Sequence, residues 1–355
     1  MKRKSKIILD DSKHVFVIAE AGSNWKSGSY QNDIKRAKKL IKLAANAGAD
    51  AVKFQTYNSN SVYVPNAGKS EYLKKSGFDE DIFKVFQEYS MPHKMLKELS
   101  VICDKEKILF MSTPFSVDDA IAVNKFVKIH KIAAFEINHV RLLEYLASTK
   151  KPIIVSTGAS NLSDIDFAVK LLKNKGAKKI CLLQTTSKYP ASIESLNLKT
   201  ISELKKRYQI PIGLSDHSVD PNLAPSIAIG LGATIIEKHF TLNKKFVGPD
   251  HNFALNPKEL FQFIKTIRES EKALGSGIKK ILSEEKELRQ FATRSIQAIT
   301  EISKNDEFVE GKNIDVLRSG NQRKGENARF LTKIIKKKSN RKIKLGDGVF
   351  LKDCQ

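Results

Sequence analysis

The sequence predicts an α/β fold, a TIM (β/α)8 barrel followed by a small second domain, on two observations. Short apolar, β-branched runs alternate with amphipathic segments, which is the pattern of βα units around a parallel sheet. Polar residues directly follow nearly all of these runs, as at the edge of a barrel where active sites are built. Eight such units span about 250 of the 355 residues, which is the usual length of a TIM barrel.

The predicted strands share a content of Val, Ile, Leu and Phe and are bounded by polar residues or turn signals. They are residues 15–19, 51–54, 108–111, 127–132, 152–155, 180–183, 210–214 and 233–236. The predicted helices between them carry apolar residues at helical spacing. They are residues 34–47, 94–106, 117–126, 142–148, 163–175, 198–208 and 222–231.

The pattern changes towards the C-terminus, and this change predicts the domain boundaries. Residues 1–281 are assigned to the barrel domain, and the charged, helix-like residues 282–293 to a linker. Residues 294–355 alternate short strands with turns, which predicts a small second domain. A chain of this length ordinarily divides into a larger and a smaller domain.

The net charge of +23 raises the question of nucleic-acid binding. Most of the lysines are spread along the chain, and the concentrated run at residues 333–344 has no interleaved aromatic residues for base stacking. We therefore expect no nucleic-acid partner, and a basic surface that attracts small anionic substrates. A non-catalytic barrel that binds a polyanion remains the alternative from another functional class.

Targeting signals and cysteine chemistry are also constrained by the sequence. The apolar runs fall short of the roughly 20 residues that cross a bilayer, so no membrane span is expected. Basic residues 2–6 lead into only three apolar residues, unlike a secretory signal, and a cytoplasmic location is expected. Three widely spaced cysteines fit neither a disulfide framework nor a zinc cluster.

Two histidines, His217 and His239, close the seventh and eighth predicted strands, so a barrel places them side by side. Neutral imidazole is the commonest protein ligand of divalent transition metals, and two protein ligands leave positions open for substrate and water. Asp216 and Glu237 flank the histidines and could orient them. Two hydrogen-bonded structural histidines are the alternative.

Two lysines, Lys53 and Lys131, lie within apolar strands. A buried ammonium is costly unless it pairs with an anion or loses its proton, and both outcomes are commonly functional. Together with the hydroxyls of Thr113, Ser156 and Ser215, these lysines predict a cradle for a phosphate and a carboxylate.

Nine segments, in order along the barrel, resemble the sialic acid synthase family, which includes the N-acetylneuraminate, legionaminic and pseudaminic acid synthases. They are residues 18–24, 48–56, 112–115, 130–132, 156–158, 189–190, 213–217, 237–241 and 248–250. The segment after Arg294 is similar to the antifreeze-like (SAF, β-clip) domain of that family. The resemblance implies a domain-swapped homodimer in which the small domain of one subunit caps the barrel of the other.

The resemblance also implies a transferase activity. Phosphoenolpyruvate and water would react with an open-chain N-acetylated hexosamine, such as N-acetylmannosamine, to give a nine-carbon 2-keto sugar acid and phosphate. His217 and His239 would hold a divalent metal, Mn²⁺ in the first place, with Mg²⁺ or Co²⁺ as alternatives. A synthase that uses a diacetamido-trideoxyhexose and an aldol synthase that uses a phosphorylated sugar remain open.

Individual residues take their roles from the same resemblance. The implied catalytic residues are Glu20, Lys53, Lys131 and Glu237. The implied substrate-binding residues are Gln55, Thr113, Glu136, Ser156, Ser187, Tyr189, Ser215, Asp250 and, from the partner subunit, Arg318. The chain departs from the family pattern at Ala134, where the family often has a phosphate-binding serine, and at residues 24–27, 184–187 and 318–320.

Overall fold

The computed structural model of the protein describes residues 9, 14–75 and 77–355. The chain forms two compact units, Met1–Gly275 and Ser276–Gln355. The basic residues 2–6 lie outside the described residues. In the described part of the chain, no helix is both long enough and apolar enough to cross a membrane.

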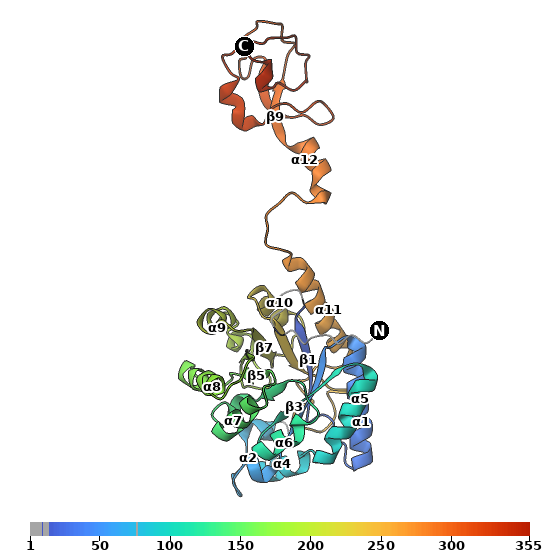
Figure 1. The fold of residues 1–355 in the computed structure, drawn as a ribbon. Coiled ribbons are helices and arrows are strands. Elements are labelled where there is room, and N and C mark those ends of the chain that lie inside the picture. Colours follow the sequence, from blue (N-terminus) through green and yellow to red (C-terminus); the bar gives the residue numbers. More distant parts are fainter. Residues whose placement is uncertain (1–8, 10–13, 76) are drawn as a thin grey trace. The chain divides into compact units, whose positions relative to one another are not determined.

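Eight parallel strands build the first unit, and this confirms the predicted barrel (Figure 1). They are β1 (Phe16–Gly22), β2 (Ala51–Thr56), β3 (Leu109–Pro114), β4 (His130–Ile132), β5 (Ile153–Ser156), β6 (Ile180–Thr185), β7 (Ile212–Asp216) and β8 (Ile235–His239). Hydrogen-bonded pairing runs in the order β3-β2-β1-β8-β7-β6-β5-β4, and β3 contacts β4. The carboxyl ends of all eight strands therefore meet at one face.

Helices surround the strands in Figure 1. The main ones are α1 (Tyr30–Ala47), α5 (His93–Glu106), α6 (Val117–Asn124), α7 (Val140–Ser148), α8 (Leu162–Asn174), α9 (Thr200–Tyr208), α10 (Leu223–Gly230) and α11 (Pro257–Leu274). Helix α1 shows why these segments are helical, because it buries Ala37, Leu40 and Ala44, which lie on one side of a helix. The Ser29 side chain caps its first turn, and Gly48, at φ 89°, ends it in the left-handed conformation.

Buried side chains form two layers in the barrel unit. The larger layer lies between strands and helices and includes Val17, Leu40 and Phe263. A smaller cluster, including Ile18 and Met111, lies on the opposite face of the strands and fills the barrel interior. This apolar cluster packs next to the polar carboxyl ends of the strands and supports them.

The strands extend further towards their carboxyl ends than the apolar runs predicted. β1 continues through Glu20 to Gly22, and β8 continues through Glu237 to His239. The predicted strands ended with the apolar run, whereas the polar side chains that follow are buried and contact one another inside the barrel. The predicted site residues of these strands thus stand on strands, not on mobile turns.

Three short helices that the sequence analysis did not predict follow β2. They are α2 (Ser59–Val62), α3 (Glu71–Lys75) and α4 (Ile82–Tyr89). Tyr57, Ile82 and Tyr89 form a separate buried cluster there. Helices of four to eight residues are too short to show a clear helical period in the sequence.

The second unit begins with η3 (Ser283–Glu285) and α12 (Lys286–Ala292), where a charged helical linker was predicted. Its two strands, β9 (Arg294–Ala298) and β10 (Ile314–Arg318), pair antiparallel. Ile296, Phe308 and Ile343 belong to its own buried core. Turns and the short helices η4 (Ala328–Lys333) and η5 (Leu351–Asp353) make up much of the remainder.

Candidate active site

Lys53 is the centre of a buried charged network at the carboxyl ends of β1, β2 and β8. Its Nζ lies 2.7 Å from Glu20 Oε2 and 3.7 Å from Glu237 Oε2, and it donates a hydrogen bond of 2.9 Å to Thr113 Oγ1. Gln55 Nε2 donates to the other oxygen of Glu20 at 3.2 Å. Lys53 is 3% exposed, so the predicted burial of this ammonium is confirmed.

Lys131 joins the same network from β4. Its Nζ donates to Ser156 Oγ at 2.7 Å and to the carbonyl of Ile132 at 2.9 Å, and it lies 3.8 Å from Glu237 Oε1. Ser215 donates to the same Glu237 oxygen at 3.0 Å. Both predicted lysines and the three predicted hydroxyls are therefore gathered around one carboxylate.

The two glutamates of the network differ in their ionisation. Burial opposes ionisation of Glu237, but the ammonium groups of Lys131 and Lys53 outweigh it and lower its pKa to about 2. Burial raises the pKa of Glu20 to about 7 despite the adjacent Lys53. Glu237 is thus the ionised carboxylate, and Glu20 is able to take up or release a proton near neutral pH.

Lys131 is also easier to deprotonate than an ordinary lysine. Burial lowers its pKa to about 8, although Glu237 acts in the opposite direction. Among the described residues, the Glu237 carboxylate lies within 4 Å of the ammonium, at 3.8 Å, and the two hydrogen-bond acceptors of Lys131 are neutral. The nearby positive charge of Lys53 further lowers the pKa of Lys131. A bound anion at this place would supply the missing negative charge.

The imidazoles of His217 and His239 lie next to each other in an edge-to-face arrangement, with ring centroids 5.6 Å apart. His217 Nδ1 lies 2.8 Å from the carbonyl of Thr186, so this nitrogen carries the proton and Nε2 keeps a free lone pair. Burial lowers the pKa of each histidine to about 3, so both rings are neutral. The predicted meeting of the two imidazoles is confirmed.

Aromatic and acidic side chains lie beside this pair of rings. The Tyr189 ring lies 4.2 Å from that of His217, and the Phe253 ring lies 5.2 Å from that of His239. Asp250 Oδ2 accepts hydrogen bonds from the backbone and hydroxyl of Ser23 and lies 3.7 Å from His239 Nδ1. The loop that carries Asp250 therefore reaches the imidazole pair.

The residues present fit a divalent metal with an incomplete protein shell. His239 Nδ1 is buried without a hydrogen-bond partner in the described part of the chain, and both rings are neutral as metal binding requires. The described residues contain no group of three or more His, Cys, Asp or Glu side chains that could hold a metal ion. Two imidazoles would leave the remaining positions to substrate and water, which suits Lewis-acid chemistry.

Ser187 and Glu136 lie at the same end of the barrel, after β6 and in η1 (Ala134–Glu136). Ser187 Oγ and Glu136 Oε2 are buried without a hydrogen-bond partner in the structure as described. Ser187 packs against Gly158, where a Cβ would lie only 2.2 Å from its hydroxyl oxygen. Buried polar atoms without partners are uncommon in proteins, so both atoms are candidates to bind substrate.

The ionisation of Glu136 gives a stability prediction. Burial raises its pKa to about 7 from an ordinary 4.5, so the folded state holds the proton more tightly than the unfolded state. Ionisation therefore costs stability as the pH rises from about 4.5 to 7. We expect Glu136→Gln to increase the free energy of unfolding at pH 8 by about 2–3 kcal/mol, and to change it little at pH 5.

Urea denaturation of both proteins at the two pH values measures this difference. Glu144, a partly buried carboxylate on α7 that pairs with Arg141 and Lys175, provides the control, because Glu144→Gln should not stabilise the protein at pH 8. An equal gain from Glu136→Gln at pH 5 and pH 8 would contradict the assignment.

Arg318 belongs to the second unit, whereas the other predicted site residues belong to the first unit. A cavity of about 260 Å³ is lined there by Arg318, Gln297 and Ser319, among others. Gln297 Oε1 and Ser319 Oγ are buried without a hydrogen-bond partner in the part of the chain that the structure describes. The role of Arg318 in substrate binding stays a prediction.

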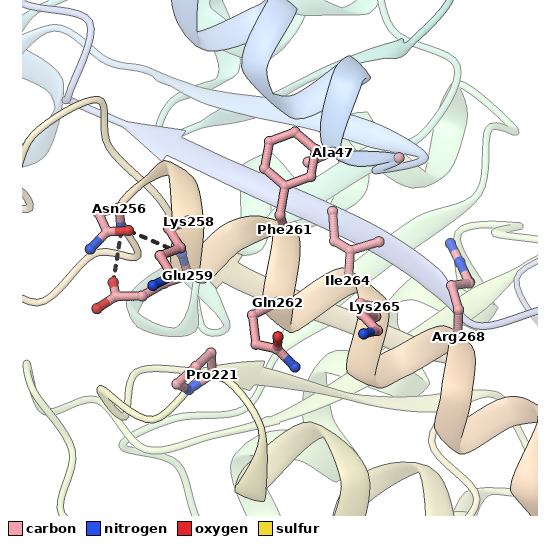
Figure 2. A pocket seen from close by; sticks show the side chains of 11 residues that line it. Ala47, Pro221, Asn256, Lys258, Glu259, Phe261, Gln262, Ile264, Lys265 and Arg268 are labelled. Carbon is pink, nitrogen blue, oxygen red and sulfur yellow. Dashed lines mark hydrogen bonds between the residues drawn. The ribbon is translucent and has the colours of Figure 1, made fainter.

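A further cavity, of about 800 Å³, lies beside α11 and is shown in Figure 2. Phe261, Ile264 and Arg268 line it from α11, and Ala47 lines it from the end of α1. None of the predicted catalytic, metal-binding or substrate-binding residues is in its lining. The chemistry of the site does not depend on this cavity.

Sequence reasoning missed part of the surroundings of the site. Phe253 and Ser23 contact predicted site residues, and the Thr186 carbonyl sets the tautomer of His217. Phe253 lies close after the predicted site residue Asp250 in the sequence, so its position was a usable signal. No sequence pattern marks a single backbone carbonyl as a histidine partner.

The fold and the site together define the class of this protein: an α/β barrel whose strand ends hold buried lysines, a paired carboxylate and two neutral imidazoles. The NeuB family model matches residues 40–279. The chain belongs to this family, the nonulosonic (sialic) acid synthases, as the sequence motifs predicted.

Individual relatives agree with this assignment. The chain is 39% identical to N,N'-diacetyllegionaminic acid synthase of Campylobacter jejuni over 84% of its length and 89% of that protein. It is 38% identical to the spore coat polysaccharide biosynthesis protein SpsE of Bacillus subtilis, over 89% of this chain and 87% of that one. The crystal structure of an N-acetylneuraminic acid synthetase from Leptospira borgpetersenii matches with a TM-score of 0.68 and 33% identity, covering 79% and 92% of the two chains.

Proposed function

We propose that this protein condenses phosphoenolpyruvate with an open-chain N-acetylated hexosamine and water, giving a nine-carbon 2-keto sugar acid and phosphate. The supporting observation is the arrangement of Lys53 and Lys131, two buried ammonium groups with hydroxyl partners at the ends of the barrel strands. Phosphoenolpyruvate carries a phosphate and a carboxylate close together, so its two anions match two cations.

The chain's own residues supply binding, orientation and proton transfer in this proposal. The lysines and the hydroxyls of Thr113, Ser156 and Ser215 hold the two anionic groups and align the methylene carbon. The π electrons of the enol double bond form the bond from that carbon to the aldehyde carbon of the acceptor, and the aldehyde oxygen takes up a proton. Water adds at the phosphate-bearing carbon and gives up its protons, and the bond from this carbon to the phosphate oxygen breaks, which leaves the 2-keto group and releases phosphate. Glu20, with its pKa near 7, exchanges the protons that these steps require.

A divalent metal, Mn²⁺ in the first place and otherwise Mg²⁺ or Co²⁺, would be held by His217 and His239. When bound, it would polarise the aldehyde oxygen as a Lewis acid. Tyr189 beside the two rings, and Asp250 at their edge, are placed to contact the acceptor sugar. Arg318 would reach the acetamido group from the partner subunit of a homodimer.

The acceptor has a second candidate, a diacetamido-trideoxyhexose. The observation that favours it is the 39% identity to a relative named for diacetyllegionaminic acid. Both candidates present an open-chain aldehyde to the same site, so they differ in substituents and not in reaction. A phosphorylated hexosamine is the third acceptor to compare.

Purified protein incubated with phosphoenolpyruvate, Mn²⁺ and each acceptor in turn tests the proposal. We expect one acceptor to give phosphate and a 2-keto acid in equal amounts, read by a colorimetric phosphate assay and by product mass. Phosphate without a matching adduct would mean hydrolysis and not condensation. Silence with all acceptors, together with DNA retention that is lost steeply with salt, would favour the polyanion-binding alternative.

A further inference from the structure

Lys238 is a buried lysine that the proposed reaction does not use. It lies in β8 between Glu237 and His239 and is 2% exposed. Side chains alternate along a strand, so Lys238 points away from the barrel interior that Glu237 and His239 face. An ammonium removed from water in this way is retained only with strong partners.

Its partners lie on both sides of His217. Lys238 Nζ pairs closely with the Asp216 carboxylate and donates to the carbonyl of Ser218 at 2.7 Å. Asp216 in turn accepts a hydrogen bond of 2.8 Å from the Ser218 backbone N–H. Asp216 and Ser218 are buried as well, at 1% and 3% exposed.

These contacts connect the two backbones that carry the imidazoles. Asp216 and Lys238 are paired neighbours in the β7–β8 ladder, and each directly precedes a histidine. β7 ends at Asp216, so His217 stands just beyond the regular ladder. The bond from Lys238 to Ser218 holds this segment beyond the end of the strand.

We propose that Lys238, through Asp216 and Ser218, is a positioning residue that fixes His217 at the correct separation from His239 for metal binding. This inference rests on the proposed function, because it requires the two histidines to share a metal. Lys238 itself touches neither the metal nor the substrate. Residues that orient metal ligands without touching the metal typically increase the metal affinity tenfold to hundredfold.

The test uses the double variant Asp216→Asn/Lys238→Met, which removes both charges together and so avoids an unpaired buried ion. Mn²⁺ binding is measured by electron paramagnetic resonance of the free ion, without substrates. We expect the Kd for Mn²⁺ to rise tenfold to hundredfold, while the Kd for phosphoenolpyruvate measured without metal changes less than threefold. A purely structural pair would leave the Mn²⁺ affinity of the folded variant unchanged.

The matched control is Asp50→Asn/Arg268→Met, which removes another ion pair, of 3.0 Å, at the amino ends of the strands. It should lower stability and leave Mn²⁺ binding as in the wild type. If the first double variant does not fold, Asp216→Glu keeps both charges and shifts the carboxylate by one methylene group, and we expect a smaller rise in Kd, about threefold to tenfold.

Two outcomes separate the inference from the function on which it rests. If wild type binds Mn²⁺, His217→Ala does not, and the folded Asp216 and Lys238 variants bind as wild type does, the positioning role is overturned and the metal site stands. If His217→Ala binds Mn²⁺ as tightly as wild type, the proposed metal site is disproved, and so is the positioning role that depends on it.

Discussion

Replacing His217 or His239 by alanine is expected to abolish phosphate release from phosphoenolpyruvate and leave the protein folded. Each imidazole is neutral and buried, the ring centroids lie 5.6 Å apart, and His239 Nδ1 has no hydrogen-bond partner in the described structure. Loss of either ring would remove half of the protein ligands of the proposed metal. We expect kcat/KM to fall by at least about a thousandfold, equivalent to roughly 4 kcal/mol.

The measurement is phosphate release under saturating Mn²⁺, with circular dichroism to verify folding. His130→Ala is the matched control, because His130 is also a fully buried imidazole on a barrel strand, where burial lowers its pKa to about 4. Its Nε2 bonds to Asn124, outside the site. Wild-type turnover in His217→Ala or His239→Ala would refute the metal assignment, and an equal loss in His130→Ala would show that the effect is not specific to the site.

The barrel was predictable because its regularities repeat. Eight apolar runs of similar length fixed the architecture, and parallel strands necessarily bring their carboxyl ends together. It followed that Lys53 from β2 and Lys131 from β4, far apart in the sequence, would lie at the same end of the barrel. The structure also places both ammonium groups within 4 Å of Glu237, a partner that the sequence did not predict for them.

The finer properties of the site were not predictable from residue types. Glu20 and Glu237 are both buried glutamates beside Lys53, yet their pKa values move in opposite directions. The difference arises because Glu237 has a second lysine and a hydroxyl nearby, which depends on distances between strands. Lys238 escaped notice for the same reason, since its partners are defined by the β7–β8 register.

The short helices after β2 show a different limit. Their side chains pack mainly on one another, around Tyr57 and Phe86, in a cluster separate from the main core. Sequence periodicity detects a helix by the stripe that it presents to a large core, and such short segments have no long stripe to detect. Their existence was therefore visible only in three dimensions.

Lys131→Met is expected to weaken phosphoenolpyruvate binding by about thirtyfold or more. The ammonium is 2% exposed, and its hydrogen-bond partners, Ser156 and the Ile132 carbonyl, are neutral. Glu237, at 3.8 Å, is shared with Lys53, so the two lysines together retain a positive charge for an anionic substrate. Truncating one member of a buried charge pair costs about 2–5 kcal/mol, largely because the other charge is left without compensation. Methionine keeps the volume and the apolar stem, which limits the disturbance of packing.

Isothermal titration of phosphoenolpyruvate without acceptor separates binding from turnover. Lys151→Met provides the control, because Lys151 is a partly buried lysine whose Nζ donates to the carbonyls of Asn124 and Val127 before β5 begins, at the opposite end of the strands. That variant should keep the wild-type Kd. Because Lys131 donates to the site hydroxyl of Ser156 and Lys151 donates to backbone carbonyls far from the site, similar losses in both variants would mean that the effect comes from folding. Undiminished binding by Lys131→Met would show that the anion lies elsewhere.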